Sequence, residues 1–573
     1  MNNLRLPSVE KPWMKLFEGM ELPKEEDINR TLNSFLWKNN EGGMDDVAIE
    51  YFGRLISFGE MKENVWQLAR AMKKNGVKKG DIVTICAVML PEIIYMFYAL
   101  ELLGATPNMV DPRTSTEGIH DYIEEAKSKI CVTLSVAYPK IKKSVLDTEV
   151  EKVVVVSPAD SLTGIKKVLY KAGNKDKNVY ENNVVMWKPF FETGRGMKDE
   201  FDYEDFDPNH PALIVHTGGT TGNPKGVMLG AVALNALAAQ YALYGYKRKQ
   251  KFLNVMPPFI AYGYACGVHL PLSRGVRTIL IPAFEPKDFG NLLTKHKANH
   301  IAGVPLHYQT LARDPGMKGK DLSFLMSPGV GGDAITTGAE IEVNEFFKAH
   351  GCKSPLMKGY GMTELASTTT TCTPDHSKLG SVGFPLALMT VGIFDVETGK
   401  ELTYGEEGEI CATGPNLMLG YYEKEFETRQ VLKKHEDGKL WMHTGDVGII
   451  DEDGYVFIRS RVKRLIIRHD GFKLFPSNIE NVISNHPGVK TCSAVGVDDP
   501  EHIQGRLPAV FIVCDKESGK SEDEIIAEVR EICQKELAEY SQPLYFVGVE
   551  ELPYTGIGKV DYRTLEERAA SLA

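Results

Sequence analysis

Several protein classes are excluded by what the 573-residue chain has little of. Its nine cysteines are scattered, with no CxxC pair and no zinc-ligand spacing, so neither a disulfide framework nor a zinc ribbon is expected. Basic residues are outnumbered, 66 Lys and Arg against 77 Asp and Glu, which argues against binding to the phosphate backbone of nucleic acids. Reduced thiols are typical of a cytoplasmic protein, and we expect that location.

Long apolar runs are also missing. The N-terminal segment has no apolar core of the kind that signal peptides carry. The most apolar stretch, residues 82–105, is interrupted by Pro91, Glu92 and Glu101, so it does not provide the roughly 20 uncharged residues of a membrane span. Apolar residues still make up 43% of the chain, and its length allows several domains. We therefore expect a folded protein without a transmembrane segment.

Helix and strand patterns alternate along most of the chain. Ser57 and Glu60 have the spacing of a helix capping box, apolar residues follow at helical spacing, and Gly76 fits the end of that helix. Residues 81–88 and 153–156 have the apolar, β-branched pattern of buried strands. This rhythm predicts an α/β fold, with helices and parallel-rich sheets in a large N-terminal body of several subdomains that we place at residues 1–460.

Two regions interrupt the rhythm. Residues 159–205 are polar and rich in lysine, and we interpret them as a surface insertion. Their apolar and basic piece, residues 164–172, is interpreted as a solvated amphipathic helix, with contact to an anionic membrane as the less favoured alternative. After the basic run 459–464, fresh strand and helix patterns predict a separate small α+β domain over residues 461–573.

The sharpest local signal is the sequence TGGTTGNPKG, residues 217–226, which follows an apolar strand. Its glycines allow backbone N–H groups to form an anion nest, and its threonine hydroxyls and Lys225 add donors and positive charge. Phosphate is the natural ligand, although the spacing is not that of a Walker A loop, and a purely structural turn is the alternative. The residues expected to contact phosphate are Thr217, Gly218, Gly219, Thr220, Thr221, Gly222 and Lys225.

Three further motifs, KGYGMTE, HTGDVG and PYTGIGKVD, combine glycines with a chemically useful side chain. Tyr360 can stack on a base, and Glu364 offers an oxygen ligand suited to Mg²⁺. Asp446 can accept two hydrogen bonds from a ribose diol. Lys559 can place a positive charge where negative charge develops in a transition state. Each residue taken singly could equally be structural, so the argument depends on their order along the chain.

In this order the motifs resemble the adenylate-forming superfamily, which comprises acyl-CoA synthetases, luciferases and the adenylation domains of peptide synthetases. The likeness extends over essentially the whole chain and is greatest to bacterial fatty acyl-CoA ligases. The resemblance implies a two-step reaction. A carboxylate attacks the α-phosphate of ATP to give an acyl-adenylate and pyrophosphate, and a thiol then displaces AMP. It also implies that the small C-terminal domain is mobile and rotates between the two steps.

The resemblance assigns a role to each motif residue. Lys559 is the catalytic lysine, Thr220 and Glu364 hold Mg²⁺, and Arg464 is the hinge of the small domain. The residues implied in ATP or AMP binding are Thr217, Gly218, Gly219, Thr220, Thr221, Gly222, Lys225, Gly331, Gly359, Tyr360, Gly361, Met362, Thr363, Asp446 and Arg461. Those implied in the acyl pocket are Phe259, Ile260, Tyr262, Gly329 and Gly332, and those that face the thiol are Gly471, Phe472 and Lys473.

The sequence departs from the family pattern at four places, and one is Gly218, which replaces a frequent serine and is similar to bacterial long-chain fatty acyl-CoA ligases. Arg464 occupies a position more often held by Asp or Lys, and the stretch 461–471 is one residue longer than usual. The histidine that many members carry around Ile260 is missing. The segments implied in the acyl pocket are apolar and offer no Asp or Arg to grip an amino group, which favours an aliphatic or aromatic acid over an amino acid.

We therefore expect an acid–thiol ligase that depends on ATP, Mg²⁺ and coenzyme A and acts on a small carboxylic acid, with a fatty acid as the favoured substrate. The alternatives are an aromatic-acid CoA ligase, an acyl-AMP ligase that loads a carrier-protein thiol, and a non-catalytic nucleotide-binding relative. A homodimer and peripheral membrane contact are compatible with the sequence, whereas a nucleic-acid partner is not expected.

Overall fold

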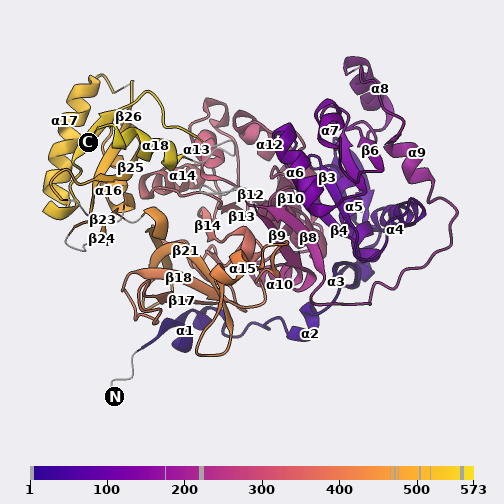
Figure 1. The fold of residues 1–573 in the computed structure, drawn as a ribbon, viewed down its shortest axis with the longest axis horizontal. Coiled ribbons are helices and arrows are strands. Elements are labelled where there is room, and N and C mark those ends of the chain that lie inside the picture. The colour runs from indigo at the N-terminus through magenta and orange to yellow at the C-terminus, as the bar shows by residue number, and fades with distance from the viewer. Residues whose placement is uncertain are drawn as a thin grey trace.

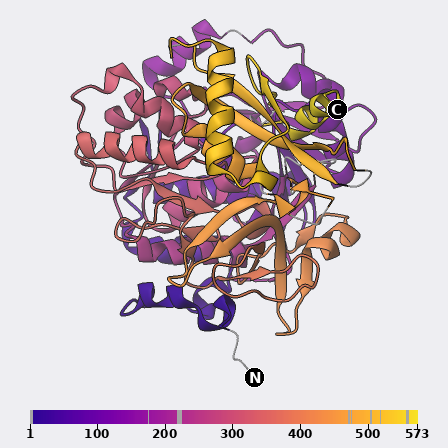
Figure 2. The same ribbon diagram turned by 90° about the vertical axis from the view of Figure 1, so that its left-hand side faces the viewer.

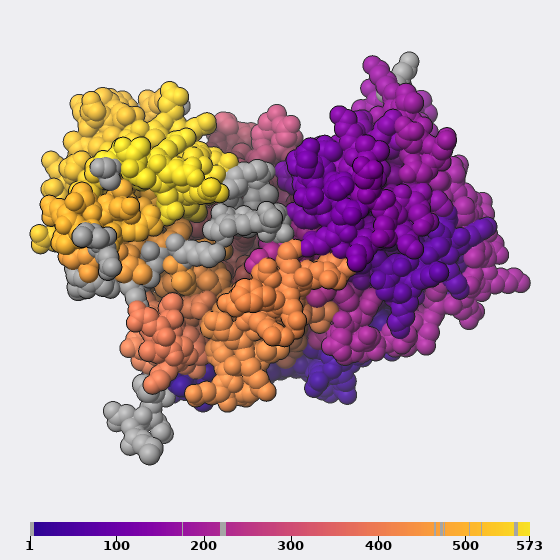
Figure 3. All heavy atoms as spheres, viewed as in Figure 1, coloured from indigo at the N-terminus to yellow at the C-terminus, as the bar shows by residue number. Residues whose placement is uncertain are grey.

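The computed structural model describes residues 5–174, 176–217, 225–464, 466–469, 473–474, 476–502, 505–516, 518–554 and 560–572. The chain forms a large body and a smaller C-terminal lobe, which Figure 1 shows in yellow at one end of the molecule. Figure 3 shows the same lobe as a separate mass beside the body. This mixed α/β architecture confirms the predicted fold class.

The body is built on two large sheets. The first has the strand order β19-β9-β8-β4-β3-β5-β6-β7 and is parallel from β8 to β7, with β9 and β19 antiparallel. Its strands are β3 (Ile82–Cys86), β4 (Thr106–Val110), β5 (Ile130–Leu134), β6 (Lys152–Val156), β7 (Val184–Met186), β8 (Pro211–His216), β9 (Gly226–Gly230) and β19 (Gly420–Tyr421).

The second sheet has the order β16-β15-β14-β13-β12-β10-β11-β1-β2, parallel from β14 to β1 and antiparallel at both ends. Its strands are β1 (Val47–Tyr51), β2 (Arg54–Ser57), β10 (Lys251–Asn254), β11 (Arg277–Leu280), β12 (His300–Gly303), β13 (Ser327–Val330), β14 (Met357–Tyr360), β15 (Thr370–Thr371) and β16 (Phe384–Pro385). The carboxyl ends of parallel strands are where α/β proteins place their ligands.

A third sheet, antiparallel, completes the body and leads to the lobe (Figure 1). Its strands are β17 (Thr390–Phe394), β18 (Gly408–Thr413), β20 (Leu432–Lys434), β21 (Leu440–Ile450) and β22 (Val456–Arg461).

The helices of the body are α1 (Pro7–Glu10), α2 (Glu25–Ile28), α3 (Leu32–Asn40), α4 (Phe58–Lys74), α5 (Pro91–Leu102), α6 (Thr116–Ala126), α7 (Tyr138–Ser144), α8 (Gly164–Gly173), α9 (Trp187–Glu192), α10 (Ala231–Tyr241), α11 (Leu270–Ser273), α12 (Phe289–His296), α13 (Pro305–Ala312), α14 (Thr337–Ala349) and α15 (Glu425–Val431).

The most apolar stretch of the sequence is a buried strand followed by a buried helix. All residues of α5 except Glu101 are buried, so this helix is apolar on every side because it lies in the core. Across the described residues, no helix combines the length and apolar character that a membrane crossing requires.

Helix α4 follows the predicted signals at both ends, with one difference. The Ser57 hydroxyl accepts the Glu60 N–H (3.1 Å), and Gly76 adopts a positive φ of +98° just after the helix. The Glu60 carboxylate binds Arg54 in the neighbouring strand instead of turning back to Ser57. Only half of the capping box is therefore formed, because a tertiary ion pair competes for the carboxylate.

The C-terminal lobe is a three-stranded sheet covered on both faces. Its elements are β23 (Ile466–Ile467), β24 (Lys473–Leu474), α16 (Pro476–Ser484), β25 (Val489–Asp498), β26 (Arg506–Cys514), α17 (Glu522–Glu536), β27 (Tyr545–Gly548) and α18 (Tyr562–Ala570). Ala494 packs with α16 and α17, whereas the next residue, Val495, packs with α18, as alternation along a strand requires. Figure 2, which looks onto the lobe, shows α17 lying across the sheet.

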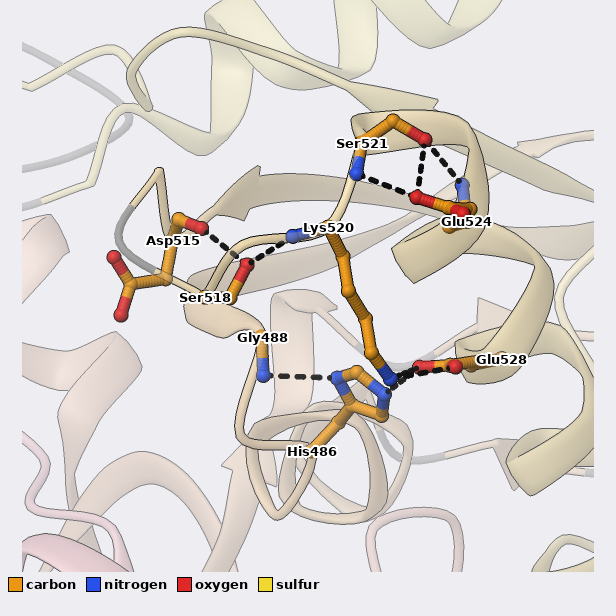
Figure 4. Close-up of polar contacts among 8 residues, drawn as sticks. All are labelled: His486, Gly488, Asp515, Ser518, Lys520, Ser521, Glu524 and Glu528. Carbon is orange, nitrogen blue, oxygen red and sulfur yellow. Dashed lines mark hydrogen bonds and ion pairs between the residues drawn. The ribbon is translucent and has the colours of Figure 1, made fainter.

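Polar contacts fix α17 on the lobe (Figure 4). Ser521 and Glu524 form a complete capping box at its start. His486 accepts the Gly488 N–H at Nδ1 (3.1 Å), so its Nε2 carries the proton that faces Glu528 (2.8 Å). Lys520 and His486 both hold the pKa of the Glu528 carboxyl below its usual range, and the lysine has the larger effect.

Residues 159–205 are only partly the predicted surface insertion. β7 pairs in parallel with β6 and extends the first sheet, and Trp187 and Phe190 of α9 are buried. Helix α8, by contrast, stands at the outer corner of the body in Figure 1.

Candidate active site

The predicted phosphate loop connects β8 to β9. Thr217 and Lys225 close its base, because the Thr217 N–H donates to the Lys225 carbonyl (3.0 Å) and the Lys225 N–H donates to the Thr217 hydroxyl (3.3 Å). The loop itself, residues 218–224, lies outside the described residues. The predicted contacts that fall on it are Gly218, Gly219, Thr220, Thr221 and Gly222.

Glu364 lies beside the base of this loop. It is 6% exposed, and the Tyr421 hydroxyl donates to its Oε1 (2.8 Å). The Lys225 ammonium in turn lies 4.6 Å from the centre of the Tyr421 ring. Burial raises the pKa of Glu364, whereas the Tyr421 hydroxyl and the charges of Arg461 and Lys225 lower it. Lys225 at the base of the loop, the predicted metal ligand Glu364, and Arg461 of the last strand of the body therefore lie near one another.

This setting suits a divalent cation. Buried carboxylates are normally paired with a cation or bound to a metal. Among the described residues, the one side chain that hydrogen-bonds the Glu364 carboxylate is the neutral Tyr421. The buried carboxylate is thus short of positive charge, which Mg²⁺ would supply through the oxygen ligands it prefers.

The turn after Glu364 has an uncommon backbone conformation. Ala366 (φ +49°) and Ser367 (φ +91°) both adopt positive φ, at a cost of about 1 kcal/mol or more for residues other than glycine. The Met362 carbonyl accepts the N–H groups of Leu365 and Ser367, both at 3.0 Å, and holds the turn. Strain of this kind concentrates at functional sites, where the surrounding structure fixes a side chain in position.

Tyr360, Asp446 and Arg461 form a second cluster at the same end of the body. The Tyr360 hydroxyl donates to Asp446 Oδ2 (2.7 Å), and Arg461 Nε lies 2.8 Å from Asp446 Oδ1. Asp446 and Arg461 are direct partners across β21 and β22. Burial raises the pKa of Tyr360, and the charge of Asp446 raises it further. The Tyr360 hydroxyl and Arg461 therefore hold the Asp446 carboxylate in one orientation.

The predicted glycines bring two strand ends close together. A Cβ on Gly331 would lie 3.1 Å from the Gly359 carbonyl, and one on Gly361 would lie 1.9 Å from the Ser367 carbonyl. Gly332 has a φ of +81°, which favours glycine. Together with Thr363, these residues place backbone from β13 and β14 next to Glu364, at the carboxyl ends of parallel strands.

The predicted acyl segment leads into an eight-residue π-helix, η4 (Tyr262–His269). Phe259 is buried and Ile260 is half-buried just before it. The Tyr262 hydroxyl donates to the Gly303 carbonyl (3.4 Å) and lies 3.9 Å from the Cβ position of Gly331. The π-helix, an arrangement common at functional sites, therefore aims Tyr262 at the glycine-rich strand ends. The remaining pocket residue, Gly329, lies in β13, next to this edge.

The structure places an Asp–Arg pair from outside the acyl segments beside Phe259. The Arg113 guanidinium is 5.5 Å from the centre of the Phe259 ring and binds both oxygens of Asp111. They come from the loop after β4, far away in sequence. Because Asp111 is engaged by Arg113, this pair does not by itself provide an amine-binding carboxylate.

Arg464 is held by three elements of the lobe. Its guanidinium donates to Glu480 Oε1 (2.5 Å) in α16 and to the Ala494 carbonyl (3.1 Å) in β25. It also lies 3.9 Å from the centre of the Tyr562 ring, at the start of α18. Its side chain is 16% exposed. The predicted hinge residue is thus anchored in the lobe, and its hinge role remains a prediction.

The stretch 461–471, which is one residue longer than usual, contacts the lobe through His469. The His469 ring stacks on the His502 ring at 3.4 Å, and both imidazoles face Asp499. Gly471 and Phe472 lie outside the described residues, as does the Lys473 side chain, although the Lys473 backbone pairs in β24. The catalytic candidate Lys559 also lies outside them, in the segment 555–559, whose flanking residues Tyr554 and Val560 form an antiparallel bridge.

Sequence reasoning missed three residues of this region: Tyr421, Arg113 and Glu480. None has a local signal, since each acts on a residue that is distant in the sequence, namely Glu364, Phe259 and Arg464.

Comparison with known protein families gives two matches. The model described as AMP-binding enzyme matches residues 36–422, and the model described as AMP-binding enzyme C-terminal domain matches residues 478–559. Among curated proteins, the long-chain-fatty-acid–CoA ligase of Bacillus subtilis is 30% identical over 567 residues, covering 97% of this chain and 98% of its own. Probable 4-coumarate–CoA ligase 1 of Dictyostelium discoideum is 32% identical over 411 residues, covering 70% of this chain and 71% of its own.

Solved structures share the fold at lower identity. ATP-bound MatB from Rhodopseudomonas palustris superimposes with a TM-score of 0.80 at 24% identity, covering 95% of this chain and 99% of its own. The anthranilate CoA ligase AuaEII in complex with anthranoyl-AMP also has a TM-score of 0.80, at 19% identity, covering 96% and 99%. Both likenesses support the large body and smaller C-terminal lobe.

Proposed function

The chain belongs to the AMP-binding enzyme family and is an ATP-dependent acid–CoA ligase that works through an acyl-adenylate, and we propose that its acid is a fatty acid. The observation that carries the proposal is the end-to-end likeness to a ligase named for long-chain fatty acids. The apolar character of the acyl segment agrees with it, since Phe259 and Ile260 carry no group that would favour a polar acid.

The first half-reaction, formation of the acyl-adenylate, would be catalysed by positioning of the substrates and by neutralisation of phosphate charge. Asp446 would accept the ribose hydroxyls, held in orientation by Tyr360 and Arg461. Lys225 and the loop N–H groups would bind phosphate. Glu364 and Thr220 would hold Mg²⁺, which when bound neutralises phosphate charge. Fixing the carboxylate next to the α-phosphate replaces a bimolecular encounter by a local one, so no side-chain nucleophile is required.

Lys559 would bring positive charge to the carboxylate and the α-phosphate as they react. Tyr562, three residues further on, lies close enough to Asp333 and Arg461 for their charges to act on its pKa, after the larger effects of burial, Arg464 and Glu480. The residues just after Lys559 therefore lie within electrostatic range of Arg461, the partner of Asp446. For the second half-reaction the lobe would rotate, so that Gly471, Phe472 and Lys473 meet the thiol of coenzyme A.

The proposal is tested by measuring pyrophosphate release with fatty acids of graded chain length and with 4-coumarate, each with and without coenzyme A. We expect long-chain fatty acids to give the highest kcat/KM, and acyl-CoA to form when coenzyme A is present. A higher kcat/KM with 4-coumarate would instead assign the aromatic-acid activity that the Dictyostelium relative's name describes. Acyl-AMP that accumulates and resists coenzyme A would point to a carrier-protein thiol.

The role of Lys559 is tested by Lys559→Ala. Removing one aligned positive charge should slow acid-dependent pyrophosphate release by roughly 10²–10³-fold. Attack of coenzyme A on supplied acyl-AMP should be spared, because the other face of the lobe serves that step. Lys520→Ala, which removes a lysine bound to Glu528 in the lobe, is the control. Equal loss of both half-reactions in Lys559→Ala would contradict the assignment.

A further inference from the structure

Helix α8 presents its apolar face to solvent. Ile165, Val168 and Leu169 are 74%, 66% and 63% exposed, and Ala172 is also exposed. Their spacing of three, four and seven residues places them in one stripe along the helix. The structure describes every residue of α8, and none is buried. An amphipathic helix on a globular body normally faces the other way, with its apolar stripe toward the core.

The opposite face of α8 is attached to the body, so its orientation is fixed. Tyr170 packs against the main core. Lys167 donates to the Asp160 carbonyl (3.2 Å), and Lys166 donates to the Phe52 carbonyl (2.6 Å). These contacts turn the apolar stripe of this surface helix outward.

The hairpin between β1 and β2 extends the apolar surface. Phe52, whose carbonyl Lys166 binds, is 54% exposed, and Leu55 is 51% exposed. Phe52 has a φ of +48°, an uncommon conformation for an aromatic residue. Arg54 donates to the Ser161 carbonyl (3.2 Å) and ties the hairpin to the segment before α8. We call these six apolar residues the α8 patch: Phe52, Leu55, Ile165, Val168, Leu169 and Ala172.

Positive charge surrounds the patch, although the chain as a whole carries a net charge of −11. Residues 164–177 contain one acidic residue, Asp176, and five lysines, at positions 166, 167, 171, 175 and 177. Lys167, Lys171 and Lys188 all lower the pKa of Asp160, which burial raises, so these three lysines gather on one side of the body. This corner of an acidic protein therefore combines exposed apolar side chains with nearby lysines.

We propose that the α8 patch docks this enzyme on an anionic lipid membrane. The apolar stripe enters the boundary between headgroups and acyl chains, and the exposed Lys171 and Lys177 bind anionic headgroups. Each lysine near such a surface contributes about 1 kcal/mol, or roughly fivefold in affinity. The role of the site rests on the proposed function, because long-chain fatty acids partition into membranes and a docked ligase would meet its acid there. The binding itself does not depend on the identity of the acid.

The experiment is co-sedimentation of the full chain with vesicles of phosphatidylcholine alone or with phosphatidylglycerol added. We expect binding to the anionic vesicles, weaker binding to the neutral ones, and a loss of binding as salt concentration rises. A wild-type chain that does not sediment with anionic vesicles at low salt would overturn the proposal.

Matched variants distinguish binding through the α8 patch from nonspecific binding through any exposed apolar residue. Val168→Ser with Leu169→Ser should weaken binding at least tenfold and leave the thermal midpoint unchanged, because both side chains are exposed. The control, Val9→Ser with Leu440→Ser, removes two exposed apolar residues elsewhere, 74% and 51% exposed, and should bind like the wild type. Equal binding by the patch and control variants would overturn the proposal.

Charge is tested by Lys171→Gln with Lys177→Gln. Both lysines are exposed, and we expect a loss of about fivefold for each on anionic vesicles, with little change on neutral ones. Light scattering tests the competing occupant, a second copy of the chain. A wild-type dimer that Val168→Ser with Leu169→Ser converts to a monomer, without vesicle binding, would reassign the patch to self-association.

A failure of the membrane-docking proposal can be distinguished from a failure of the proposed fatty-acid ligase function. Vesicle binding needs neither ATP nor turnover, so a chain that binds vesicles but prefers 4-coumarate would keep the docking surface and lose the fatty-acid assignment. Turnover of a water-soluble short-chain acid should be the same in the wild type and in the Val168→Ser, Leu169→Ser variant, since the patch lies outside the active site.

Discussion

Arg461 and Arg464 are three residues apart, but they belong to different halves of the molecule. Arg461 ends the last strand of the body and binds Asp446 there, with its side chain 54% exposed. Arg464 is 16% exposed and is bound by Glu480 and Tyr562 of the lobe. Between them the chain changes from one set of partners to the other. A rotation of the lobe that turns the backbone between these two arginines would leave both sets of contacts intact.

The contacts of the two arginines also differ in how much they contribute to the stability of the protein. The Arg461 pair orients the Asp446 carboxylate, and a half-exposed ion pair contributes little to stability. The Arg464 pair is mostly shielded from water, and Glu480 also accepts the Ala494 N–H (2.8 Å), so removing one partner leaves a poorly solvated charge. We therefore expect body-side substitutions to affect ATP use and lobe-side substitutions to affect the stability of the lobe.

Asp446→Ala should have the largest effect. It would remove both proposed ribose hydrogen bonds and release Tyr360 and Arg461, and hydrogen bonds to charged groups contribute about 1.5–3 kcal/mol each. We expect KM for ATP, measured by pyrophosphate release, to rise roughly 10²–10³-fold. Asp446→Asn keeps the shape and should lose less. An unchanged ATP dependence would remove Asp446 from the ribose site.

Glu364→Gln should lower kcat about 10²-fold, because it takes a charged ligand from the proposed Mg²⁺ site. The same change should stabilise the ligand-free protein near neutral pH. Burial raises the pKa of Glu364, so the wild type loses stability as pH rises through the folded-state pKa, and the variant does not.

Thermal midpoints measured at about pH 5 and about pH 8 check this prediction for Glu364, since the ordinary pKa of Glu is about 4.3. The advantage of Gln should be larger at the higher pH and shrink as pH falls toward the ordinary pKa, below which the wild-type carboxyl is protonated in both states. An advantage that is independent of pH would point to altered packing.

Glu480→Gln tests the lobe side. The free energy of local unfolding of the lobe, measured by hydrogen exchange of the β25 amides, should fall by about 2 kcal/mol, while KM for ATP should stay the same. Glu567→Gln is the matched control, because its pair with Arg563 is exposed and should contribute only a few tenths of a kcal/mol. Similar losses in both variants would remove the distinction between the two arginines.

Tyr562→Leu should have the smallest effect, about 1 kcal/mol in the same exchange measurement. It removes the ring that lies against Arg464 but keeps an apolar side chain. Tyr562→Phe keeps the ring and should behave like the wild type. A loss in Tyr562→Phe equal to that in Tyr562→Leu would show that the hydroxyl, and not the ring, is what matters.

The sequence by itself determined the fold class and the family, and it named Tyr360, Asp446 and Arg461, which the structure brings into contact. Motifs of this kind can be read locally because glycines, caps and alternating strands act through neighbouring backbone. Gly361 is an example, since a side chain there would collide with the Ser367 carbonyl only six residues away. The order of the motifs then identified the family.

Only the tertiary structure decided which side chains act together. Tyr421 reaches Glu364 because β19 pairs with β9, and Tyr360 reaches Asp446 across 86 residues of sequence. The direction that α8 faces depends in the same way on the hairpin and the core beneath it. The periodicity of a helix shows that one face is apolar, but what that face meets is fixed by strand register and packing between distant segments, which no local pattern encodes.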